Sequence, residues 1–190
     1  EHLAALRAMP NLNVMRPADS VECAECWELA LLAKDTPTIL ALTRQGVPLL
    51  RTAPREENLS AKGAYVLSEP KGGRDVTLIG TGSETALAVQ AAKALEGEGV
   101  RAAVVSMPCF ELFAAQSQSY RDAVLGSAPR VGVEAAAAFG WPQWLGPNGA
   151  FVGMRGFGAS APEQDLYKHF GITAEAVAAA ARDLIGKSKR

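Results

Sequence analysis

The sequence predicts an α/β protein in two parts, a partial βαβ module followed by an open, mostly parallel, Rossmann-like sheet. Three observations lead to this fold class. Short apolar runs typical of strands alternate with segments whose apolar residues recur at helical spacing. Residues 46–75 interrupt this alternation with prolines and glycines, and a second alternating series follows them. The length of 190 residues allows one or two domains.

The first module is predicted from a strand, a helix and a second strand. Residues 12–15 form a short apolar run typical of a strand. Asp19, with Glu22 three positions later, is typical of a capping box, in which a side-chain oxygen accepts an amide hydrogen bond from the first helical turn. Residues 38–43 are nearly all apolar, which predicts a buried parallel strand and completes a βαβ unit.

The second series predicts the larger sheet. Within residues 46–75 only 63–67 resemble a short strand, so this stretch is the candidate linker. Further strands are predicted at 76–79, 102–105, 130–133 and 150–152, and helices at 87–95, 120–125, 162–170 and 173–185.

Composition and charge exclude several classes of protein. The 19 Lys+Arg and 20 Asp+Glu give a formal net charge of -1, so there is no basic excess for binding nucleic acid or an anionic membrane. No apolar run approaches the ~20 residues that a membrane-spanning helix needs. The 3 cysteines are too few for a disulfide scaffold and favour a reducing compartment.

Candidate site residues follow from the rule that function gathers at the carboxyl ends of parallel strands. This rule selects Arg16, Arg44, Gly80 to Ser83, Ser106 to Cys109, and Glu134. Arg44 directly follows a predicted strand, so its guanidinium can bind a phosphate or carboxylate from a rigid position. The alternative is a salt bridge that caps the sheet edge. Glu134 is likewise open to two interpretations, a site residue or an ion-pair partner.

The turn made by Gly80, Thr81, Gly82 and Ser83 lies between a predicted strand and a predicted helix. Glycines there let the backbone approach an anion at the positive end of the helix, which makes this turn a possible anion-binding site. It is not a dinucleotide fingerprint, because Thr85 occupies the position of the third glycine. The alternative is a tight turn followed by a helix cap.

Cysteines and tryptophans have structural interpretations. Cys23 and Cys26 lie within a predicted helix, without a second cysteine pair, so we interpret them as buried apolar side chains rather than zinc ligands. Cys109 is interpreted in the same way. Trp141 and Trp144 favour core packing, with a docking surface as the alternative. The residues alone assign no metal site and no nucleophile with a partner base.

Several strings of residues, in one order along nearly the whole chain, resemble the transketolase family. They are Arg16-Pro17-Ala18-Asp19 followed by Glu22, Leu42-Thr43-Arg44-Gln45, residues 62–67, Thr81-Gly82-Ser83-Glu84, residues 104–108, Phe157-Gly158-Ala159-Ser160-Ala161-Pro162, and Phe170-Gly171-Ile172-Thr173. The resemblance is to the C-terminal portion of the family's chain. The chain also begins with Glu1 inside a helical pattern, so we expect a piece of a longer protein.

The resemblance implies that residues 1–57 are the C-terminal part of the pyrimidine-binding domain, 58–74 a linker and 75–190 the C-terminal domain. It implies an enzyme that transfers a two-carbon ketol unit from a ketose phosphate to an aldose phosphate. Arg44 stands in the family's Ser/Thr-Arg-Gln string, whose arginine binds the sugar phosphate of the substrate. The pair Gly46-Val47 departs from the family's more usual Asn-Leu, which puts the shape of the loop beside Arg44 in doubt.

The resemblance also implies thiamine diphosphate as cofactor, with Mg²⁺ or Ca²⁺ holding its diphosphate. In the family, the residues that bind and activate both groups lie upstream of the position of Glu1. No catalytic and no metal-binding residue is therefore assigned, and this chain alone is expected to bind neither group and to be inactive. The implied partners are sugar phosphates and a second copy in a homodimer, and the implied location is the cytoplasm, or the plastid in a plant.

Alternatives remain within and outside this family. A pyruvate dehydrogenase β-type subunit or a deoxyxylulose phosphate synthase shares the domain order, although residues 157–162 argue against both. A split transketolase subunit is another possibility. A non-enzymatic alternative is a free-standing module for dimerisation or for binding a small anion through residues 80–83. The choice between the pentose phosphate pathway and the Calvin cycle stays open.

Overall fold

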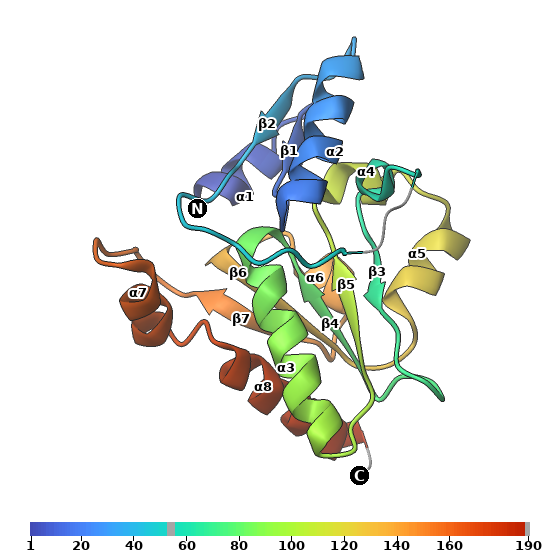
Figure 1. The fold of residues 1–190 in the computed structure, drawn as a ribbon, viewed down its shortest axis with the longest axis vertical. Helices are drawn as coiled ribbons and strands as arrows, with labels where there is room; N and C mark the ends of the chain where they lie inside the picture. The colour runs from blue at the N-terminus through green and yellow to red at the C-terminus, as the bar shows by residue number, and fades with distance from the viewer. Residues whose placement is uncertain (53–55, 189–190) are drawn as a thin grey trace.

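The computed structural model describes residues 1–52 and 56–188 (Figure 1). The N-terminal part contains helices α1 (His2–Arg7) and α2 (Ser20–Leu32) and strands β1 (Asn13–Met15) and β2 (Thr38–Leu40). The two strands are parallel, and Val14 lies opposite Ile39. The predicted βαβ unit is therefore present.

The expected burial of the strand at 38–43 is wrong. Strand β2 covers only Thr38–Leu40, and all three of its residues are half-buried. Among the described residues β1 is its one neighbouring strand. A strand with one neighbour has an open edge and a thinner cover, so its apolar residues stay partly exposed.

The larger sheet has five strands in the order β3-β5-β4-β6-β7. They are β3 (Tyr65–Ser68), β4 (Val76–Gly80), β5 (Ala102–Ser106), β6 (Arg130–Ala137) and β7 (Ala150–Met154). Strands β4 to β7 run parallel, whereas β3 pairs antiparallel with β5. The predicted α/β fold with an open, mostly parallel sheet is confirmed. The short strand expected at 63–67 is β3, so this part of the candidate linker belongs to the larger sheet.

Helices cover both faces of this sheet, as expected for buried parallel strands. One apolar core joins the sheet to α3 (Thr85–Gly97) and α8 (Ala174–Ser188), which Figure 1 shows in front of it. The other core lies against α4 (Phe110–Ala114), α5 (Gln118–Leu125) and α6 (Pro142–Leu145). Helix α7 (Glu163–Phe170) has no buried residue and lies at the β7 edge. Among the described residues, no helix is both long and apolar enough to cross a membrane.

The predicted capping box at the start of α2 is present with one difference. Asp19 is the N-cap residue, and its carboxylate accepts a hydrogen bond from the amide of Glu22 at 2.9 Å. The carboxylate of Glu22 accepts from the amide of Ala18 at 2.6 Å, one residue before the usual partner. This reciprocal pair fixes the turn that leads from β1 into α2.

Candidate functional site

The carboxyl edge of the larger sheet contains two buried carboxylates. The chain passes from β4 to β5 on one side and later returns to β6 and β7 on the other, so the strand order reverses at β4 and β6. Open α/β sheets bind ligands in the crevice at such a reversal. Glu84, in the short 3-10 helix η2 (Gly82–Glu84) after β4, and Glu134, in β6, are both fully buried there.

Arg16, from the end of β1, fills this crevice. Its Nη1 atom lies 2.8 Å from Oε2 of Glu84 and 2.9 Å from Oε1 of Glu134. Burial alone would lower the pKa of Arg16, but the two carboxylates outweigh this effect and raise its pKa. The position where related sheet architectures hold a ligand is thus occupied by a guanidinium of the chain itself.

Glu134 has two further partners. Arg7 of α1 donates to both carboxylate oxygens at 2.9 and 2.8 Å, and Nε1 of Trp141 donates at 2.8 Å. The guanidinium of Arg7 also lies 3.8 Å from the ring centroid of Phe110. Burial opposes ionisation of Glu134, but Arg7, Arg16 and Trp141 together lower its pKa. Of the two interpretations given above, the ion pair is confirmed.

The main chain of Arg16 is held as firmly as its side chain. Its amide donates to the carbonyl of Pro108 at 2.8 Å, and its carbonyl accepts from the amide of Gly82 at 2.9 Å. Gly82 has a φ of 60°, and a Cβ atom there would lie 3.0 Å from Cζ of Arg16. Gly82 therefore lets the turn approach the arginine closely.

These contacts bear on the predicted anion-binding turn. The Gly82 amide is engaged by Arg16, and the Ser83 hydroxyl donates to Oε1 of Glu84 at 2.7 Å. The Glu84 carboxylate also lies beside the turn and would repel an anion. The contacts favour the alternative interpretation, a tight turn that joins the two parts of the chain.

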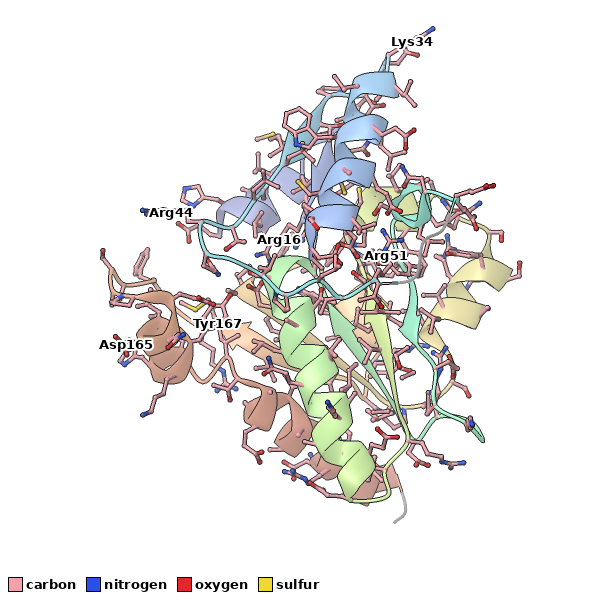
Figure 2. The ribbon with its side chains drawn as sticks, viewed as in Figure 1. Arg16, Lys34, Arg44, Arg51, Asp165 and Tyr167 are labelled. Atoms are coloured by element: carbon pink, nitrogen blue, oxygen red, sulfur yellow. The ribbon has the colours of Figure 1, made fainter. Side chains whose placement is uncertain are left out.

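Helix α7 is tied to the same crevice through one side chain. The hydroxyl of Tyr167 donates to Oε1 of Glu84 and lies 3.3 Å from the hydroxyl oxygen of Ser83. Figure 2 shows Tyr167 on the side of α7 that faces the sheet, with Asp165 on the opposite side. Sequence reasoning missed Arg7, Glu84 and Tyr167 as members of this network, because their partners are distant in the sequence.

A second buried carboxylate network lies beside the first. Glu22 of α2 accepts hydrogen bonds from the hydroxyl of Tyr65 at 2.6 Å and from the hydroxyl of Ser106. Burial raises the pKa of Glu22, and these donors offset the effect only in part. Glu22 thereby joins α2 to strands β3 and β5.

Arg44 lies apart from both networks. It is exposed, four positions after the end of β2, and Figure 2 shows it at the border of the molecule. It makes no hydrogen bond or ion pair with any other residue that the structure describes. The alternative interpretation, a salt bridge that caps the sheet edge, is therefore absent from the described part of the chain, and the guanidinium is available to bind a ligand.

The described residues include no group of three or more His, Cys, Asp or Glu side chains that could hold a metal ion. The expected burial of Cys23 is wrong, because its side chain is only half-buried. Cys26 and Cys109 are buried as interpreted, and burial raises the pKa of Cys26 to about 12. Trp141 is fully buried and Trp144 nearly so, which confirms core packing. These thiols and rings are parts of the core.

Two family models match the chain. A model of the transketolase-like TK C-terminal domain matches residues 63–173, and one of the transketolase pyrimidine binding domain matches residues 1–48. The chain belongs to the transketolase family. A transketolase of Sinorhizobium medicae is 60% identical over 99% of this chain, and one of Cereibacter sphaeroides is 62% identical over 97%.

Solved transketolases share the fold as well. The transketolase from Leishmania mexicana superposes with a TM-score of 0.88 at 46% identity and covers 98% of this chain. The chain spans 27% and 28% of the length of the Sinorhizobium and Cereibacter transketolases. It corresponds to the C-terminal portion of a transketolase.

Proposed function

We propose that this chain is part of an enzyme that transfers a two-carbon ketol unit from a ketose phosphate to an aldose phosphate, and that Arg44 binds the phosphate of the sugar. The observation that carries the assignment of Arg44 is its free, exposed guanidinium. A guanidinium offers paired N–H donors that match two phosphate oxygens. Every other strand-end candidate with a charged side chain, Arg16 and Glu134, is already paired within the protein.

Thiamine diphosphate and a divalent cation belong to the full enzyme in this proposal. When bound, the cofactor supplies the electron sink for ketol transfer. The described residues do not fit the cation, because they include no group of three or more His, Cys, Asp or Glu side chains that could hold it. We therefore assign no residue of this chain to the cofactor, and we propose that the 190 residues alone are inactive.

We propose the domain assignment that the sequence suggested, with residues 1–57 in the pyrimidine-binding domain, 58–74 as the connection and 75–190 as the C-terminal domain. One difference is that strand β3, within this connection, belongs to the larger sheet. We also propose that the full enzyme is a homodimer. Its proposed location is the cytoplasm, or the plastid if the source is a plant. The pairing of Gly82 and Ser83 within the protein argues against the rival free-standing anion-binding module.

The experiment is the substitution Arg44→Ala in the full-length transketolase that contains this sequence. We expect the KM for phosphorylated sugars to rise about tenfold or more, because a charge-assisted contact to phosphate is lost. The KM for unphosphorylated donors should change little. Arg155→Ala is the matched control, since Arg155 is also exposed. Equal effects on both classes of sugar would refute the phosphate role.

A further inference from the structure

We propose that Arg16 is a positioning residue for Arg44, and that the C-terminal sheet contributes to phosphate binding by holding Arg16. The inference rests on the proposed role of Arg44. In this proposal, the residues of the crevice at the carboxyl edge of the sheet hold Arg16 at the end of β1. Arg16 in turn fixes the loop that carries Arg44.

The first step is the immobilisation of Arg16 by three segments of the C-terminal sheet. Its amide is bound by Pro108 after β5 and its carbonyl by Gly82 after β4. Its guanidinium is bound by Glu84 and by Glu134 of β6. All three of its hydrogen-bonding parts are therefore fixed to the C-terminal sheet, and its side chain is only 11% exposed.

The second step links the stretch around Arg16 to the connection that carries Arg44. The carbonyl of Met15 accepts from the amide of Ala41 at 2.8 Å. The carboxylate of Asp19 accepts from the amides of Leu50 and Arg51 at 2.9 and 3.1 Å. Both ends of the connection 41–51 are thus tied to residues 15–19, which flank Arg16.

The position of the Arg44 side chain follows from these main-chain contacts. Arg44 has no hydrogen-bonding partner among the described residues, so its position depends on its main chain. That main chain is anchored at Ala41 and at Leu50, both on the stretch that Arg16 fixes. A shift of the stretch would displace the guanidinium without unfolding either part, and small displacements of a binding group lower affinity strongly.

The test uses the full-length transketolase that contains this sequence. Arg16→Lys keeps the charge, but its side chain is one bond shorter, so its ammonium group cannot reach both Glu84 and Glu134 as Nη1 of Arg16 does. We expect the KM for phosphorylated donors to rise about tenfold while kcat and the KM for unphosphorylated donors change less than about twofold. Arg182→Lys is the matched control, because Arg182 forms ion pairs with Glu98 and Glu175 at the surface.

A second variant tests the same link between residues 15–19 and the Arg44 loop in case Arg16→Lys does not fold. Asp19→Asn can keep the helix cap with its carbonyl oxygen while its amide group faces the Leu50 and Arg51 amides. This variant should produce the same selective rise in KM in a protein that is still folded at the assay temperature. A uniform loss of kcat with all substrates in a protein that melts normally would overturn the proposal.

A double-mutant comparison separates this inference from the function on which it rests. In the Arg44→Ala background, Arg16→Lys should have no further effect on the preference for phosphorylated donors. If Arg44→Ala lowers this preference and Arg16→Lys and Asp19→Asn do not, the positioning role is refuted and the phosphate role stands. If Arg44→Ala itself leaves the preference unchanged, the proposed phosphate role fails, and the positioning role fails with it.

Discussion

The guanidinium of Arg16 and the carboxylate of Glu84 lie 2.8 Å apart at the point where the larger sheet reverses its strand order. Arg16 comes from the N-terminal βαβ unit, and Glu84 follows the first parallel strand of the C-terminal sheet. The pair therefore fills, with the protein's own charges, the crevice in which open α/β sheets hold a ligand. The stability of the joint between the two parts should depend on it.

Glu134→Ala should destabilise the protein by about 3–5 kcal/mol, because removing one partner of a buried ion pair leaves the other charge uncompensated. Arg7 would lose both of its hydrogen bonds to a carboxylate. Urea denaturation measures the change. Glu98→Ala, which removes an exposed partner of Arg182, is the control and should leave the midpoint nearly unchanged. Similar midpoints for the two variants would contradict the importance of the buried network.

Gly82→Ala should cost about 1–3 kcal/mol in the free energy of unfolding, because an alanine is strained at positive φ. The added methyl group would also lie 3.0 Å from Cζ of Arg16. Gly97→Ala is a matched control, since Gly97 ends α3 with no atom within 4 Å of an added Cβ. Thermal unfolding compares the two. A Gly82→Ala protein that melts like the wild type would show that the close approach to Arg16 is dispensable.

The contributions of Glu22 and Glu134 to stability should depend on pH in opposite directions. Burial raises the pKa of Glu22 above its unfolded value. The contribution of Glu22 to stability is therefore fully present below the unfolded pKa of ~4.3, and it is lost as pH rises through the raised pKa. Arg7 and Arg16 overcome burial and lower the pKa of Glu134, so its contribution is present above the unfolded pKa and is lost as pH falls through the lowered pKa.

Urea midpoints measured across pH for Glu22→Gln and Glu134→Gln check this pair of signs. Relative to the wild type, Glu22→Gln should become more stable as pH rises. The difference between Glu134→Gln and the wild type should shrink in acid. Parallel pH profiles for the two variants would contradict the assignment of opposite shifts.

Tyr167→Phe should loosen α7 without disturbing the sheet. The helix has no buried residue, and the hydroxyl of Tyr167 binds the carboxylate of Glu84. Losing a hydrogen bond to a charged group costs about 1.5–3 kcal/mol, so the α7 amides should exchange with solvent roughly tenfold faster or more. Hydrogen exchange of α8, which packs in the core, provides the internal reference. Unchanged exchange in α7 would mean that other contacts hold it.

Local signals in the sequence predicted local structure well. Asp19 and Glu22 are three positions apart, and the hydrogen bond between them forms within one helical turn. The strand-end rule selected Ser106 and Glu134, because alternating strands and helices place strand ends at one edge of a parallel sheet. It also selected Arg16, which follows a strand of the smaller sheet and reaches Glu134 only through tertiary packing. The order of several strings along the chain indicated the transketolase family, which the family models confirmed.

The sequence by itself thus determined the fold class, the family, the capped start of α2 and the edge at which charged residues would meet. Only the tertiary structure decided which charges pair there. Arg7 and Glu134 are 127 positions apart, and Tyr167 and Glu84 are 83 apart. Such partners are chosen by the packing of whole elements. It is the same packing that fills the crevice with Arg16 and leaves Arg44 free at the surface.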